Sequence, residues 1–167
     1  MRGASVIECG CGTGQLSNFL GMHPARTVFG TDICLNSLKL AHGFKTRNRI
    51  PNVTFLQQNL FRPVFKPETF DLLISNGVLL VTSDPFRGFQ SIARLVKPGG
   101  YILIGLYNTF GRLSTDLRRW IFRLTGDRFQ FLDPRLRDNT VGALRKKAWF
   151  MDQYKNPYET KQSYGEV

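Results

Sequence analysis

Three glycines at alternate positions, directly after a short apolar run, constrain this chain of 167 residues more than any other feature. The run Val6–Cys9 leads into Gly10, Gly12 and Gly14, and a segment with helical character follows. Glycine lets the backbone turn sharply and approach a ligand because no Cβ stands in the way. A helix that follows such a loop directs free N–H groups toward the ligand. The pattern therefore predicts a buried strand, a tight ligand-binding loop and a helix.

Strand-like and helix-like segments alternate up to Asn108. The expected strands are Val6–Cys9, Thr27–Ile33, Asn52–Asn59, Phe70–Ser75 and Tyr101–Tyr107, and the expected helices are Gln15–Leu20, Leu35–His42 and Pro85–Val96. Asp84 and Pro85 suit a helix start, whereas Gly43 and the segment 97–100 are expected to stop helices. This alternation predicts an α/β fold with a doubly wound, mostly parallel sheet that carries helices on both faces.

The character of the chain changes after Asn108, so we expect a core over residues 1–108 and a C-terminal extension over 109–167 that packs on it as one domain. An expected helix there has one apolar stripe, formed by Leu113, Leu117, Trp120, Ile121 and Leu124. Residues 112–147 hold ten Arg or Lys against four Asp. The stripe favours a helix packed on the sheet edge with a basic outer face, and a nucleic-acid surface or a membrane-facing helix are the alternatives.

The glycine loop departs from two common nucleotide-binding patterns. The dinucleotide fingerprint needs Gly-x-Gly-x-x-Gly, but Gln15 or Ser17 stands at the third glycine position, depending on where the count begins. No Gly-Lys-Ser/Thr sequence ends the turn, so the phosphate-loop pattern fails as well. Glu8 would repel a pyrophosphate, whereas it suits a ligand that bears an amino group and a sulfonium.

Five segments, in the same order along the chain, resemble the class I S-adenosylmethionine-dependent methyltransferases, which have a Rossmann-like fold. The sequence Glu8-x-Gly10-x-Gly12-x-Gly14 resembles the first motif of that family, and residues 70–78 resemble its fourth-strand motif. Residues 95–101 are similar to the turn that introduces the fifth strand. The resemblance covers about residues 5–108 and implies S-adenosyl-L-methionine as the cofactor, bound at the carboxyl ends of the strands.

The resemblance also implies a role for each residue of the site. The implied cofactor-binding residues are Glu8, Gly10, Gly12, Thr13, Gly14, Asp32, Ile33, Asn59, Leu60, Asn76 and Gly77. Asp32 would bind the ribose hydroxyls and Ile33 would lie against the adenine; Asn59, where the family usually has Asp, would contact the adenine edge. Asn76 would lie near the methionine end. The alternative for Asp32 is a helix cap, and Asn59 and Asn76 also suit turns.

Two departures from the family limit what the resemblance implies about catalysis. Many members carry one or two histidines shortly after the segment that matches Ser75–Gly77, but Leu79, Leu80 and Val81 follow here. The fold normally ends with two further strands, and no strong strand signal follows Tyr107. We therefore expect these C-terminal strands to be missing, with a helical or irregular region in their place, and the catalytic residues are not assigned.

Composition adds few constraints. The net charge of +11 permits nucleic acid, an anionic surface or acidic metabolites as partners without selecting one. The three cysteines, two of them in one turn, favour free thiols, a reducing compartment and hence a cytoplasmic protein. No cysteine or histidine pair has the spacing of a structural zinc site, so no metal is expected. No apolar run is long enough to span a membrane.

These observations predict methyl transfer to a small-molecule acceptor by in-line displacement. Tyr107, Asn108 and Tyr154 are the candidate acceptor-pocket residues. Trp149, Phe150, Tyr154 and Tyr158 would either form a lid over that pocket or pack on the sheet. One alternative is a non-catalytic cofactor-binding module or fragment, and the other is a nucleic-acid methyltransferase or binder that uses the basic extension. A second copy of the chain across the open sheet edge is a further candidate partner.

Overall fold

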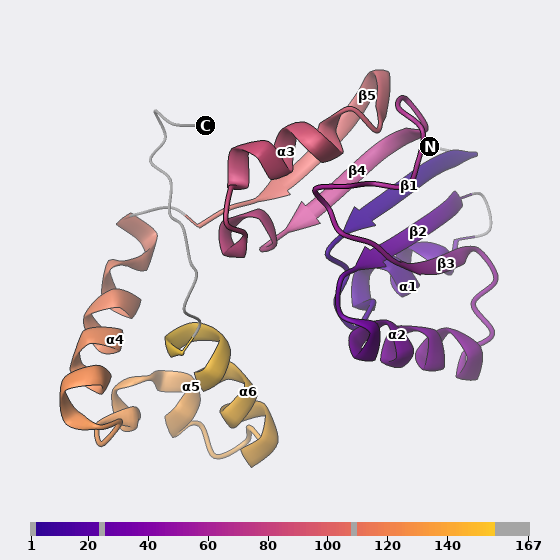
Figure 1. The fold of residues 1–167 in the computed structure, drawn as a ribbon. Helices are drawn as coiled ribbons and strands as arrows, with labels where there is room; N and C mark the ends of the chain where they lie inside the picture. Colours follow the sequence, from indigo (N-terminus) through magenta and orange to yellow (C-terminus); the bar gives the residue numbers. More distant parts are fainter. Residues whose placement is uncertain (1–2, 24–25, 108–109, 156–167) are drawn as a thin grey trace. The chain divides into compact units, whose positions relative to one another are not determined.

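The computed structural model describes residues 3–23, 26–107 and 110–155, which form two compact units that divide after Leu106 (Figure 1). The expected boundary at Asn108 and the packing of the extension on the core stay predictions.

The first unit is built on a five-stranded parallel sheet, which confirms the predicted fold class. Its strands are β1 (Ala4–Cys9), β2 (Arg26–Asp32), β3 (Val53–Gln57), β4 (Phe70–Asn76) and β5 (Val96–Gly105). They lie in the order β3-β2-β1-β4-β5, and every neighbouring pair is parallel. The order reverses at β1, because the chain proceeds from β1 to β3 on one side and returns to β4 on the other. Such a reversal separates the loops that follow neighbouring strands and opens a crevice at their carboxyl ends.

Helices cover both faces of this sheet, as predicted (Figure 1). They are α1 (Gln15–Gly21), α2 (Leu35–Arg47) and α3 (Pro85–Ala93), with a short 3₁₀ turn at Leu79–Val81. On one face, Leu16 and Leu20 of α1 pack against a core of Val6, Val28 and Val53. On the other face, Ile92 of α3 packs into a core of buried residues that contains Ile7, Cys9, Phe70 and Leu73.

Several element boundaries differ from the sequence prediction by one to three residues, and two differ by five, both next to a glycine that was expected to stop a helix. The helix expected to end at His42 continues through Gly43 to Arg47, so this interior glycine weakens α2 without stopping it. Asn48 ends the helix, since its Nδ2 donates to the carbonyl of Phe44 (2.8 Å).

The segment 97–100, expected to stop the preceding helix, belongs to β5. Between the pairs Phe70–Val96 and Leu72–Tyr101, β4 advances by two residues while β5 advances by five. Gly99, with φ of +78°, lets the strand bulge there without ending.

The second unit consists of short helices around a small aromatic core. After a 3₁₀ turn at Phe110–Arg112 come α4 (Leu113–Thr125), a 3₁₀ turn at Gln130–Leu132, α5 (Pro134–Arg137) and α6 (Ala143–Tyr154). Phe122 of α4 packs against Phe150 and Tyr154 of α6.

Ile121 of the apolar stripe predicted for α4 packs against this core, but the other four residues of the stripe do not. The side chains of Leu113, Leu117, Trp120 and Leu124 are exposed, whereas Phe122 lies in the core. The helices of residues 3–23, 26–107 and 110–155 include none with the length and apolar character that a membrane span requires.

We predict that replacing Phe70 by alanine lowers the free energy of unfolding by about 3–5 kcal/mol. Phe70 is fully buried and meets Phe29 and Phe65 edge-to-face, with ring centroids 5.7 and 5.0 Å away. Urea unfolding followed by circular dichroism measures the change. Phe86→Ala is the matched control, because that ring is 69% exposed and should change stability by less than about 1 kcal/mol. Equal losses in the two variants would place the core elsewhere.

Candidate functional site

A cavity of about 370 Å³ lies at the carboxyl ends of the strands, next to the point where the strand order reverses. Segments that follow four of the strands contribute to its walls. The lining residues are Gly10, Thr31, Asp32, Ile33, Gln58, Asn59, Leu60, Phe61, Gly77, Val78, Val81 and Thr82. Its position and its size are those expected for a small-molecule site in an open parallel sheet.

The cavity brings together six of the eleven residues that the sequence assigned to the cofactor. These six are Gly10, Asp32, Ile33, Asn59, Leu60 and Gly77. They come from the ends of β1, β2, β3 and β4, which lie far apart in the sequence. The other five residues are not part of the cavity wall.

The glycine loop has backbone geometry that requires glycine at Gly10 and Gly14. Both have positive φ, 78° and 72°. A Cβ on Gly10 would lie 2.2 Å from the side chain of Val78, which is itself a wall of the cavity. A Cβ on Gly14 would lie 2.6 Å from Ala41. The loop is fixed to β2, since the N–H groups of Gly10 and Cys11 both donate to the carbonyl of Thr31 (2.7 and 2.9 Å).

Asp32 holds the loop and the next helix through its carboxylate. Its Oδ2 accepts the N–H of Gly12 (2.8 Å), and its Oδ1 accepts the N–H of Cys34, the residue that precedes α2 (2.8 Å). Both interpretations of Asp32 therefore have support: it binds the start of a helix and it lines the cavity. A carboxylate has about four acceptor positions, so two remain for a ligand.

Glu8 has a partner within the protein. Its side chain is buried on the α1 face of the sheet, and the hydroxyl of Ser17 donates to its Oε2. Burial raises the pKa of Glu8, and the charge of Asp32 adds to the rise although the bond from Ser17 opposes it. Glu8 does not line the cavity, so its predicted contact with the cofactor stays a prediction.

Three further predicted residues lie outside the cavity wall. Thr13 is exposed, and Gly12 is tied to Asp32 as described above. The amide of Asn76 lies over Gly105 of β5, where its Oδ1 occupies the space that a Cβ would take.

The residues expected at the acceptor pocket have contacts within the second unit. The guanidinium of Arg112 lies 4.2 Å from the ring centre of Tyr107. Tyr154 is buried and its hydroxyl donates to Asp133, which also accepts a bond from Trp149 (3.0 Å). Burial raises the pKa of Tyr154 to about 12. Asn108 and Tyr158 lie outside the described residues, so the acceptor pocket and the aromatic lid stay predictions.

Sequence reasoning missed half of the cavity wall. The additional residues are Thr31, Gln58, Phe61, Val78, Val81 and Thr82. Thr31, Gln58 and Phe61 flank predicted residues by one or two positions, so a wider window around each strand end would have found them. Val81 and Thr82 carry no signal in a single sequence, because an apolar 3₁₀ turn places them there.

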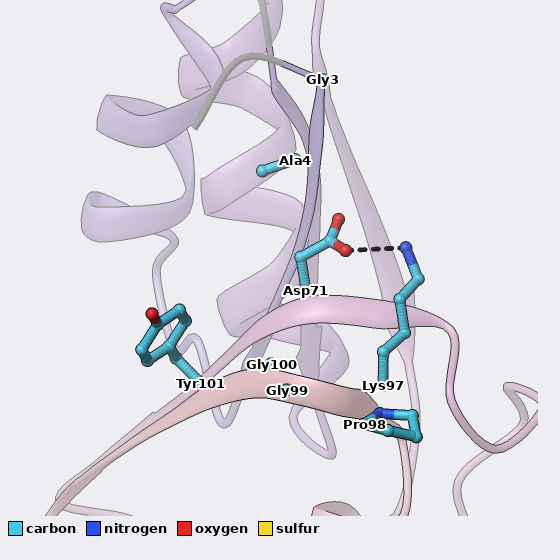
Figure 2. Close-up of a pocket in the computed structure, with 8 residues that line it drawn as sticks. All are labelled: Gly3, Ala4, Asp71, Lys97, Pro98, Gly99, Gly100 and Tyr101. Carbon is cyan, nitrogen blue, oxygen red and sulfur yellow. Dashed lines mark hydrogen bonds and ion pairs between the residues drawn. The ribbon is translucent and has the colours of Figure 1, made fainter.

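A second hollow, of about 450 Å³, lies at the opposite, amino-terminal edge of the sheet (Figure 2). Lys97 and Asp71 form an ion pair across it (2.7 Å), and Ser5 donates to the same carboxylate. The bond from Lys97, with those from Ser5, holds the pKa of Asp71 at about 2. None of the predicted site residues lies in this hollow, so we assign it no ligand.

The three cysteines are free thiols, and the two buried ones, Cys9 and Cys11, lie on either side of Gly10 in the sequence. Burial raises the pKa of Cys9 and of Cys11 to about 12, so both carry their protons at neutral pH. Over residues 3–23, 26–107 and 110–155, no group of three histidine, cysteine or acidic side chains is arranged to hold a metal.

We predict that Glu8→Gln becomes more stable relative to the wild-type protein as the pH rises from about 4 to 8. The pKa of Glu8 is raised in the folded state, so its contribution to stability is complete below the unfolded value of about 4.3 and is lost as the pH passes the folded value. Glutamine has no such dependence. Urea unfolding of both proteins at several pH values measures the difference, and a difference that does not change with pH contradicts the assigned burial of the charge.

The family comparison agrees with this geometry. The sequence profile of the family described as "Methyltransferase domain" matches residues 7–104, which is more than half of the chain. The match contains the whole sheet except residues 4–6 of β1 and Gly105 of β5. The match contains all eleven predicted cofactor-binding residues.

Individual relatives are longer proteins. The chain is 28% identical over 127 residues to a ubiquinone biosynthesis O-methyltransferase of Vibrio cholerae, covering 74% of this chain and 48% of that protein. It is 28% identical over 147 residues to the human mitochondrial arginine-hydroxylase NDUFAF5, covering 87% and 41%. The chain thus spans less than half the length of these curated relatives.

Solved structures share the fold. PKMT2 from Rickettsia typhi superposes with a TM-score of 0.74 at 18% identity, over 95% of this chain and 35% of that one. At this identity the likeness shows the fold alone. Together with the profile match, it leads to one conclusion: the chain belongs to the methyltransferase-domain family, the class I S-adenosylmethionine-dependent methyltransferases that its sequence resembles.

Proposed function

We propose that the chain binds S-adenosyl-L-methionine in the cavity at the carboxyl edge of the sheet and that a small-molecule acceptor is methylated there. One observation carries the proposal: the cavity collects six predicted cofactor residues from four strand ends at the reversal point of the sheet. Family membership supports the same cofactor. A cytoplasmic location belongs to the proposal and is supported by the three free cysteines.

The residues present fit this cofactor. The lack of a Cβ at Gly10 lets the loop pack directly against Val78, since a Cβ there would lie 2.2 Å from that side chain. Asp32 retains acceptor positions for the ribose hydroxyls, in addition to its bonds to Gly12 and Cys34. Leu60 and Phe61 provide apolar wall that suits an adenine ring, and Gly77 lies on the opposite part of the wall, toward β4.

For methyl transfer from a sulfonium, the main contribution of the protein is to position the reactants. When bound, the cofactor supplies a methyl group on a sulfonium: the nucleophile forms a bond to the methyl carbon while the carbon–sulfur bond breaks and sulfur keeps the electron pair. The glycine loop and Asp32 hold the nucleoside, and the cavity walls exclude water from it. Orientation of this kind supplies much of the acceleration of a bimolecular transfer.

Because the chain matches only part of its longer relatives, two alternative functions stay open. One relative is named for a hydroxylase, so membership of the family does not by itself specify methyl transfer. A cofactor-binding module without catalysis is the first alternative. A nucleic-acid methyltransferase or binder is the second, and the ten Arg or Lys of residues 112–147 motivate it. Binding to generic RNA that weakens steeply with salt would favour the second alternative.

We predict that calorimetric titration of the wild-type chain with S-adenosylmethionine shows one site and that Asp32→Ala weakens it at least tenfold. Hydrogen bonds to a charged group contribute about 1.5–3 kcal/mol each, and about 1.4 kcal/mol is tenfold in affinity. Asp71→Asn is the matched control, because that carboxylate lies at the opposite edge of the sheet and should leave the affinity unchanged. A folded wild-type protein that gives no binding heat overturns the proposal, and equal effects of the two variants refute the role of Asp32.

A second copy of the chain is the partner that we propose for the open sheet edge. Within the described residues β5 pairs with β4 alone, and Tyr101 and Leu103 on this strand are 63% and 54% exposed. An unpaired edge with exposed apolar side chains is a template for pairing. Light scattering should give the mass of a dimer for the wild-type protein and of a monomer for Leu103→Lys. A monomeric wild-type protein removes this part of the proposal.

A further inference from the structure

Gln58 is a buried amide at the edge of the cavity, and none of the sequence motifs includes it. It directly follows β3, is 6% exposed, and lines the cavity together with Thr31. An amide in such surroundings is destabilising unless its donors and its acceptor find partners. Its contacts therefore indicate what the side chain does.

The side chain of Gln58 connects segments that are separate in the sequence. Its Oε1 accepts the N–H of Val64 (3.0 Å), and its Nε2 donates to Oγ1 of Thr31 (3.4 Å). Its backbone N–H donates to the carbonyl of Asp32 (3.0 Å). The hydroxyl of Thr31 in turn donates to the carbonyl of Glu8 (3.3 Å). One series of hydrogen bonds thus joins the ends of β1, β2 and β3.

The loop that Gln58 holds carries a wall of the cavity. Three of the lining residues lie between Gln58 and Val64, namely Asn59, Leu60 and Phe61. No helix or strand runs through residues 58–64, so neither a strand ladder nor a helix fixes this segment. A turn closes it locally, through the bond from the N–H of Arg62 to the carbonyl of Asn59 (2.9 Å). The loop is held near β2 by the bond between Gln58 and Val64 at its far end, together with the packing of Leu60 against the core.

We propose that Gln58 is a positioning residue for the cofactor: it fixes the loop 59–64 against the end of β2, so that the cavity keeps the width that the nucleoside requires. The inference rests on the proposed function, because it concerns the cavity assigned to S-adenosylmethionine. Gln58 takes no part in the transfer of the methyl group, and its contribution is to affinity.

The test compares two buried amides, one at the cavity and one away from it. Gln58→Met keeps the length of the side chain and removes both hydrogen bonds. Asn18→Leu is the matched control, since Asn18 is 1% exposed in α1, donates to the carbonyl of Ala41 (3.2 Å) and lies outside the cavity wall. For each full-length protein, thermal unfolding measures stability, and calorimetric titration well below the unfolding temperature measures the affinity for S-adenosylmethionine.

We expect both variants to unfold at lower temperature, but only Gln58→Met to bind the cofactor at least about fivefold more weakly. Affinity within twofold of the wild-type value for Gln58→Met, or an equal loss for Asn18→Leu, overturns the inference and leaves the proposed function intact. A folded wild-type protein that does not bind overturns both. If Gln58→Met does not fold, Thr31→Val removes the hydroxyl that accepts from Gln58, and it should weaken binding by about two- to fivefold; unchanged affinity in that variant again overturns the inference.

Discussion

The carboxylate of Asp32 joins three elements at the carboxyl edge of the sheet, and the arrangement of the candidate site depends on that junction. Asp32 is the last residue of β2, and its carboxylate accepts one N–H from the glycine loop after β1 and one from Cys34 before α2. Hydrogen bonds from backbone N–H groups to a carboxylate are stronger than those between neutral groups. Parallel pairing brings these chain ends together, and the charged side chain then fixes their loops. A ribose hydroxyl that meets this carboxylate therefore finds an acceptor whose direction is already set.

The face of the sheet below the loop is organised around the second carboxylate, Glu8. Ser17 of α1 donates to it, and this contact requires α1 to lie close to β1 at Glu8 and hence to Gly30, which pairs with Glu8 on β2. Gly30 makes this close approach possible, because a Cβ there would lie 2.7 Å from the Ser17 hydroxyl and 2.7 Å from Phe55. A glycine inside a strand weakens it, so its presence reflects this close approach. The same local geometry positions the start of α1 under the loop.

Sequence patterns predicted the sheet, its helices and six of the residues that meet in the cavity, because parallel strands bring the polar residue after each strand to one edge. They failed where the outcome depends on a particular neighbour. Gly43 was expected to end α2, but the helix runs on to Asn48, whose side chain binds the carbonyl of Phe44. Gly99 was expected to lie in a turn, but it lies in β5, which bulges there against β4. The partner of Glu8 within the protein was not foreseen, because Ser17 lies nine residues away on another element. The position of Gln58 beside a strand end could have been noticed, but its bond to the backbone of Val64 could not be read from the sequence.

The charges close to the glycine loop, rather than the net charge of the chain, decide which ligands the loop attracts. The chain carries a net charge of +11, which at long range disfavours a cation, but salt screens interactions beyond about 8 Å. Near the loop the field is negative: after burial itself, the charges of Glu8 and Asp32 are what raise the pKa of Cys11. A sulfonium with an amino group is attracted to this region, whereas a pyrophosphate is repelled. The ten Arg and Lys of residues 112–147 belong to the other unit, so a polyanion that they attract would meet a different set of residues from those of the glycine loop.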